Sequence, residues 1–209
     1  MLRTLVLLLF PLVLMVFGGP VNACSKPKYS GAFLKQIPTK GINQSLFSEA
    51  LRREVNYVRC SANRGELAAA EPLTKIAAGH STWMARAEKL SHTSTVPGKS
   101  RVARRVKSTG IKYRTAAENI AAYNRFAFPK GQFKIRNASA CKFATQSGKA
   151  IPAHSYASLA AAVVGGWMKS SGHKKNLLNR RMKLAGGGLA FDGKAPYCGR
   201  FFVTQNYLG

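Results

Sequence analysis

The order of the patterned segments predicts an α+β fold for this chain of 209 residues. Helix-type spacing of apolar residues fills much of the first half, whereas the two clearest strand-type runs lie near the C-terminus, at residues 186–191 and 201–207. Parallel α/β folds alternate strands with helices, and no such alternation is visible here. No internal repeat is visible either, so we expect one domain rather than an array of repeated units.

Two long helices are predicted first. Apolar residues recur at spacings of three and four from Ser45, with arginines on the other face, until the segment Asn63-Arg64-Gly65 ends the helix. Pro72 suits the first position of a second helix, which we expect to reach about Leu90. His80 lies on the apolar stripe of this second helix and is expected to be a core residue.

The middle of the chain is less regular. Ser100 can cap a short basic helix that stops at Gly110. Residues 118–123 follow as a helical turn or a strand. Residues 124–154 are rich in Pro, Gly, Lys and Ser, and they predict a long loop, which in a compact domain is usually functional or mobile.

A last helix and a hairpin complete the predicted elements. The helix is expected to begin at Ser155 or Ser158 and to run to about Lys169. Turn residues, Asp192-Gly193 and Pro196, lie between the two C-terminal strands and therefore favour a β-hairpin.

The first 23 residues have the pattern of an export signal. Arg3 gives a positive start, residues 5–17 an apolar core, and Val21-Asn22-Ala23 a small-residue cleavage site. The apolar run is too short, and Pro11 too disruptive, for a spanning helix, which needs about 20 apolar residues. We therefore expect cleavage after Ala23 and a secreted or periplasmic protein.

Cleavage at this point divides the chain into three parts. They are a signal peptide at residues 1–23, an extended lead-in at residues 24–44, and a folded domain at residues 45–209. Two alternatives are an uncleaved membrane anchor and a lipoprotein attached through Cys24, the residue that follows the cleavage site.

The four cysteines predict two disulfides, because an even number of cysteines in an exported protein usually pairs. They are Cys24, Cys60, Cys141 and Cys198. No C-x-x-C motif is present, so the sequence supports neither a zinc ribbon nor a thioredoxin site. Three pairings are open, of which we favour Cys24–Cys60 and Cys141–Cys198. Lipidation of Cys24 would leave an odd thiol.

The charge is strongly positive, with 33 Lys and Arg against 7 Asp and Glu and a formal net charge of +26. Such a field attracts anionic partners: an envelope polymer, a lipid surface or nucleic acid. Basic clusters lie at residues 101–107 and 174–183. Nucleic acid is the least favoured partner, because no aromatic residue interrupts the first cluster and no known nucleic-acid-binding motif is visible. A solvated surface that keeps the protein soluble is the alternative.

Few residues can carry chemistry. Asp192 is the only aspartate, and there is no G-x-S-x-G nucleophile motif, so the sequence supports no covalent hydrolase. His92, Glu118 and His173 remain, and imidazole nitrogens with a carboxylate can hold zinc while leaving a position open for water. Their spacing alone does not predict that they meet.

Each of these residues also has a structural explanation. His92 follows a helix end, where a protonated imidazole would interact favourably with the helix dipole. His173 is expected on a glycine-marked turn just after the last helix and could cap that helix. Glu118 could be a buried carboxylate that accepts backbone hydrogen bonds.

Four segments in order resemble the CAP superfamily, which comprises the cysteine-rich secretory, antigen 5 and pathogenesis-related 1 proteins. The likeness covers about residues 45–208 and is greatest to the bacterial members, which read W-M-x-S-x-G-H-x-x-N-x-L. The segments are Leu90-Ser91-His92, Ala117-Glu118-Asn119-Ile120-Ala121, the run from Trp167 to Leu178, and Val203-Thr204-Gln205-Asn206-Tyr207.

The resemblance implies a three-layer α-β-α sandwich with a central antiparallel sheet. It also implies that His92, Glu118 and His173 meet in one cleft, with His92 and His173 able to bind a metal ion such as zinc. Ser170 stands in this cleft where eukaryotic members have a second acidic residue, three places after the helix tryptophan. Without that carboxylate the resemblance assigns no catalytic residue.

We therefore expect an exported binding module rather than an enzyme. CAP relatives are variously linked to lipid or sterol binding, to host interaction and in a few cases to proteolysis, so the resemblance also allows a small lipid ligand. A metal-dependent hydrolase acting on peptide or envelope polymer is the first alternative, and a basic nucleic-acid-binding protein is the second.

Overall fold

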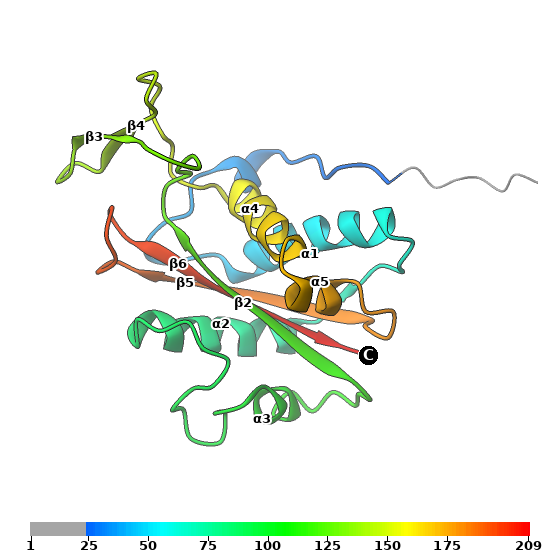
Figure 1. Ribbon diagram of the computed structural model, residues 1–209. Helices are drawn as coiled ribbons and strands as arrows, with labels where there is room; N and C mark the ends of the chain where they lie inside the picture. Colours follow the sequence, from blue (N-terminus) through cyan, green and yellow to red (C-terminus); the bar gives the residue numbers. More distant parts are fainter. Residues whose placement is uncertain (1–23) are drawn as a thin grey trace, which may run out of the picture.

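The chain folds around a central four-stranded sheet that has helices on both faces (Figure 1). The structure is a computed structural model that describes residues 24–209, so the expected signal peptide lies outside the described residues. The strand order is β1-β5-β6-β2. The strands are β1 (Ala68–Ala69), β2 (Ala116–Asn124), β5 (Leu184–Asp192) and β6 (Arg200–Leu208).

The three long strands are antiparallel, as expected. β6 lies in the middle and pairs along its whole length with β5 and β2, while the two-residue β1 pairs with β5 in parallel. The short edge strand makes the sheet mixed. The expected hairpin is the β5–β6 pair, and residues 118–123 belong to a strand rather than to a helical turn.

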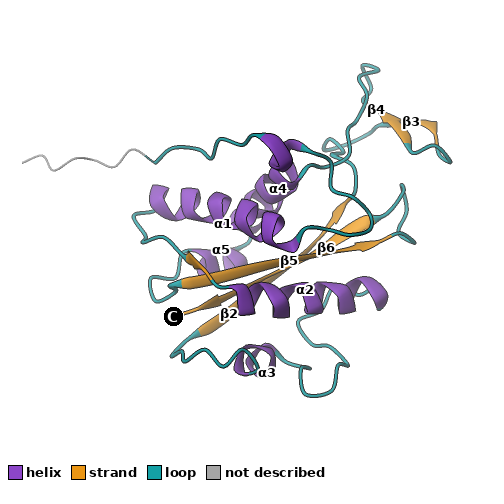
Figure 2. Cartoon of the chain, turned by 180° about the vertical axis from the view of Figure 1, so that it is seen from behind, coloured by secondary structure: helices purple, strands orange, loops and turns teal. Residues whose placement is uncertain are grey.

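Two helical layers enclose the sheet, which confirms the α-β-α sandwich (Figures 1 and 2). On one face lie η1 (Gly31–Leu34), α1 (Gln44–Ser61), α4 (Tyr156–Met168) and α5 (Ser171–Leu177). On the other face lie α2 (Glu71–Arg86) and α3 (Val102–Lys107). Within residues 24–209, no helix has both the length and the apolar character needed to cross a membrane.

Three consecutive glycines in β5 let the helices approach the sheet closely. A Cβ atom at Gly186 or Gly188 would overlap the backbone of α2, whereas one at Gly187 would lie 2.9 Å from the Leu51 side chain of α1. Successive strand residues point to opposite faces, so the run clears space on both sides of the sheet. The Gly186–Gly188 segment therefore sets how close the two helical layers lie.

The disulfides confirm the favoured pairing. Cys24 is bonded to Cys60, which ties the lead-in to the end of α1, and Cys141 is bonded to Cys198. Residues 24–209 contain no free cysteine. Because the sulfur of Cys24 is committed to Cys60, this arrangement leaves no thiol there for a lipid.

Three local predictions were wrong. The second helix ends at Arg86 rather than near Leu90. The expected loop at residues 124–154 contains a two-stranded sheet, β3 (Lys134–Asn137) and β4 (Lys142–Ala144), which is paired antiparallel. The segment that carries His173 is the short helix α5 and not a turn.

Candidate functional site

Glu118 is the centre of a buried hydrogen-bond network. It lies on β2, and its side chain is only 1% exposed. Arg105 donates from Nη2 to both carboxylate oxygens, at 2.8 Å each. Asn206, which is paired with Glu118 across the β2–β6 ladder, donates from Nδ2 to Oε2 at 2.9 Å.

His92 completes this network from the surface. Its Nδ1 lies 2.9 Å from Oε1 of Glu118, while half of the side chain, 51%, is exposed. An ionised carboxylate only accepts hydrogen bonds, so Nδ1 carries the proton and donates it. In the neutral form of this ring, the other nitrogen, Nε2, carries the lone pair.

The carboxyl of Glu118 is held in its ionised form. Burial opposes ionisation, but the hydrogen bond from His92 and the guanidinium of Arg105 outweigh it, so the pKa of Glu118 lies below its usual value. The structure thus agrees with a buried carboxylate, although its partners are side chains rather than backbone groups.

Arg105 belongs to this site and not to the surface. Its residue exposure is 2%, and it also donates to the backbone oxygens of His92, Lys99 and Ser100 at 2.9–3.2 Å. One guanidinium therefore ties α3 and the 92–100 loop to β2. The basic cluster predicted at residues 101–107 therefore does not expose all of its charges, because Arg105 is buried. Val102 and Val106, four residues apart, lie on the inner face of α3. Their spacing is the sequence feature that could have predicted which face of this helix is buried.

His173 is joined to the same region through its backbone. Asn119, next to Glu118 on β2, donates to the His173 carbonyl at 3.2 Å and accepts from Asn176 of α5 at 2.9 Å. Burial, and then the charge of His92, lower the pKa of His173. Asn119 and Asn176 thus attach α5 to the strand that carries Glu118.

Two further residues of the region behave differently. Ser170 is the N-cap residue of α5, but its side chain makes no capping hydrogen bond. His80 is buried, as expected, and its Nε2 lies 2.9 Å from the carbonyl of Ser91 and 3.8 Å from Glu118. Burial lowers the pKa of His80. No pattern in the sequence predicts that His80 lies beside Glu118.

The metal ligands that the family resemblance implies are His92 and His173. Glu118 cannot serve as a ligand without losing Arg105, Asn206 or His92 from its oxygens. Among residues 24–209, no group of three or more His, Cys, Asp and Glu side chains is placed to hold a metal ion. Catalytic zinc sites commonly use three protein ligands. Two histidines are fewer ligands than such a site has.

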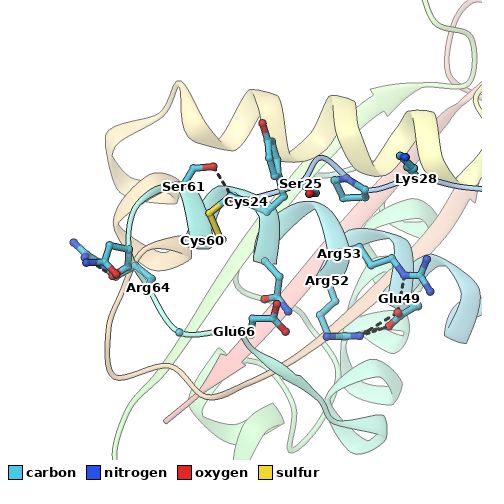
Figure 3. Close-up of a pocket in the computed structure, with 15 residues that line it drawn as sticks. Cys24, Ser25, Lys28, Glu49, Arg52, Arg53, Cys60, Ser61, Arg64 and Glu66 are labelled. Atoms are coloured by element: carbon cyan, nitrogen blue, oxygen red, sulfur yellow. Dashed lines mark hydrogen bonds and ion pairs between the residues drawn. A yellow bond between two sulfur atoms is a disulfide. The ribbon is translucent and has the colours of Figure 1, made fainter. Parts of the chain in front are cut away.

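A large pocket lies elsewhere. It is an open depression of about 1130 Å³ between the lead-in and α1, beside the Cys24–Cys60 disulfide (Figure 3). Its arginines are engaged within the protein, since Arg52 and Arg53 both pair with Glu49 at 2.8 Å. A smaller pocket of about 210 Å³ is lined by His80 and Arg105. Neither pocket is lined by His92, Glu118 or His173, so the cleft expected around these three stays a prediction.

Comparison with known proteins identifies similar structures. The chain matches an extracellular protein containing an SCP domain from Bacillus anthracis, with a TM-score of 0.54 and 25% sequence identity. The match covers 81% of this chain but only 42% of that protein. An outer surface protein from Borrelia burgdorferi matches with a TM-score of 0.52 and 16% identity, over 80% of this chain and 96% of that one. At 16% identity, the likeness to the Borrelia protein shows a shared fold and nothing further.

A search of curated protein sequences gave no match. The profile of the CAP group, described as the cysteine-rich secretory protein family, matches residues 52–207, which is most of the chain and includes His92, Glu118 and His173. Together with the three-layer sandwich, this match shows that the chain belongs to the CAP family of cysteine-rich secretory proteins.

Proposed function

We propose that the protein is an exported binding module, and that it associates with anionic material outside the cell. The proposal of a binding module rather than an enzyme rests on Glu118, whose two carboxylate oxygens are both occupied by hydrogen bonds within the protein. Its oxygens accept hydrogen bonds from Arg105, Asn206 and His92, so the carboxylate positions other groups and is not free to accept a substrate proton. Export is supported by the leader pattern, by the two disulfides and by the extracellular SCP-domain relative.

The nature of the partner follows from charge. A formal net charge of +26 favours association with acidic polymers or anionic lipid headgroups. Retention on anionic vesicles and on a soluble polyanion should be strong at low salt. It should fall as ionic strength rises past about 0.15 M, where the screening length is roughly 8 Å. Retention that does not respond to salt would contradict a charge-driven partner.

A weak metal site is the second part of the proposal. His92 donates its Nδ1 proton to Glu118, and a carboxylate that orients a histidine in this way is the usual companion of a metal-binding imidazole. The lowered pKa of His173 keeps that ring neutral near pH 7, and a neutral imidazole is the form that binds metals. Zinc titration by calorimetry should show weak binding that is lost in His92→Ala and retained in His154→Ala.

A hydrolase is the competing function, and one observation favours it. The exposed His92 ring is backed by an ionised carboxylate, as in many general bases. The test is turnover of peptide and envelope polymers by the purified protein. We expect none, and turnover that disappears in His92→Ala would favour the hydrolase. Native mass spectrometry of protein taken from its own envelope would identify bound metal or lipid in the same experiment.

A further inference from the structure

Residues 126–151, here called the arm, form an element outside the sandwich. They leave the sheet after β2, make the two-stranded β3–β4 sheet, and return to the start of α4. Both views show this segment projecting away from the body of the molecule (Figures 1 and 2). The residues of the buried network around Glu118 lie outside the arm, so its construction needs another explanation.

The arm has its own small core. Phe128 stacks on Phe133 with ring centroids 4.3 Å apart, and Phe143 packs edge-on against Phe128 at 5.1 Å. Tyr197, from the β5–β6 connection, packs against Phe133 at 5.2 Å. The Cys141–Cys198 disulfide joins the same two segments. Aromatic packing and a covalent link together hold the arm in a fixed position.

All charged side chains of the arm are positively charged. No acidic residue occurs between Glu118 and Asp192. The arm carries five basic side chains, all exposed and none in an ion pair within residues 24–209. They are Lys130, Lys134, Arg136, Lys142 and Lys149. This differs from Arg52 and Arg53, whose charges are offset by Glu49.

Exposed apolar surface accompanies these charges. Ile135 lies between Lys134 and Arg136 on β3 and is 53% exposed. It pairs directly with Phe143 across the β3–β4 ladder, so its side chain is on the aromatic side of the arm. Tyr197, on the edge of the same aromatic cluster, is 46% exposed. Successive strand residues point to opposite faces, so Lys134 projects from the face opposite Ile135, and the two meet at the unpaired edge of β3 in this two-stranded sheet. At that edge the arm presents an exposed apolar side chain beside cations.

We propose that the arm docks on the surface of an anionic lipid bilayer, with the basic side chains at the headgroups and Ile135 at the boundary with the acyl chains. This inference rests on the proposed association with anionic material and adds the site and the partner. A soluble polyanion would use the five cations but would gain nothing from the exposed isoleucine. A bilayer uses both, because its headgroups are charged and the layer beneath them is apolar.

The expected effects follow from the number of contacts. Each basic side chain near an anionic membrane contributes about 1 kcal/mol, so removing three should weaken vesicle binding about 100-fold at low salt. Burying the exposed half of an isoleucine side chain contributes roughly half of its full transfer free energy. The Ile135→Ser variant should therefore bind vesicles about tenfold more weakly.

The experiment measures binding of the full mature protein to vesicles of neutral phosphatidylcholine, with and without phosphatidylglycerol, and to soluble polyphosphate. The arm variant is Lys134→Ala/Arg136→Ala/Lys142→Ala. The matched control removes three exposed charges from the opposite helical layer: Arg101→Ala/Arg104→Ala/Lys107→Ala. Far-UV circular dichroism and thermal melting verify that each variant is folded.

We expect the arm variant to lose about 100-fold on anionic vesicles and the control only a few-fold. Ile135→Ser should weaken vesicle binding and leave polyphosphate binding unchanged. Equal losses in both triple variants would overturn the arm as the docking element while leaving the charge-driven association intact. An Ile135→Ser variant that binds vesicles like the wild type would overturn the bilayer in favour of a soluble polyanion. If the wild type binds neither material at low salt, the proposed function fails as well.

Discussion

Removing the guanidinium of Arg105 should be among the most damaging single changes in this protein. Arg105→Met keeps the aliphatic stem but removes the guanidinium that lies 2.8 Å from both oxygens of the Glu118 carboxylate, whose side chain is 1% exposed. Breaking a buried pair in this way costs about 3–5 kcal/mol, because an uncompensated charge is left in the interior. Domains of this kind have a free energy of unfolding of about 5–15 kcal/mol, so the loss is a large part of the total.

The assay is equilibrium urea unfolding near neutral pH with both disulfides intact. Arg104→Met is the matched control, since Arg104 is the exposed neighbour on the same helix, and it should stay within about 0.5 kcal/mol of the wild type. The double variant Arg105→Met/Glu118→Gln should recover part of the loss, because it also removes the stranded charge. If the double variant is more stable than Arg105→Met alone, the lost stability is due to the unpaired charge of Glu118 rather than to lost packing.

The pH dependence gives an independent check with a definite sign. The pKa of Glu118 is lowered in the folded protein, so its ionisation stabilises the fold above the ordinary pKa of 4.5 and the contribution is lost as pH falls through the depressed value. The difference between Arg105→Met and the wild type should therefore shrink in acid. A loss under about 1 kcal/mol at neutral pH, or a loss that grows in acid, would refute the buried-pair explanation.

Three other outcomes are expected. Gly188→Ala should destabilise by about 1–3 kcal/mol in the same assay because its Cβ overlaps the backbone of α2, whereas Gly79→Ala, which has open space around it, should not be destabilising. In His92→Ala, the pKa of His173 followed by NMR should rise, since one of the two causes that lower it is removed; an unchanged pKa would mean that the rings do not interact. Replacing both cysteines of the arm disulfide by serine should speed hydrogen exchange in the arm while the amides of the central sheet stay protected, and equal loss in both regions would contradict a locally anchored arm.

Much of the fold could be predicted because its signals are local. The Ser155 cap begins α4 as expected, through a reciprocal pair of hydrogen bonds with Ser158, and the turn residues after Asp192 separate β5 from β6. The apolar spacing of α1 depends only on the helical repeat. Such features follow from residues within a few positions of one another. The α-β-α layering was implied by family resemblance rather than by any pattern in the sequence.

The segments that were predicted wrongly depend on distant contacts. β3 and β4 lie in a stretch rich in turn residues, and aromatic packing with Tyr197 and the Cys141–Cys198 bond accompany their pairing. The short helix α5 begins at a serine that makes no capping hydrogen bond and is held through Asn119 and Asn176. Neither arrangement has a periodic signal of its own.

The sequence by itself determined the class of fold, the two-disulfide pattern and the excess of positive charge, because composition and short-range spacing carry that information. The tertiary structure alone decided which of the charges are available. Arg104 and Arg105 are neighbours in one basic run, yet Arg104 is exposed and Arg105 is buried against Glu118 of β2. Whether a guanidinium faces water or a buried carboxylate depends on the packing of α3 on β2, and that contact is made only when the whole chain is folded.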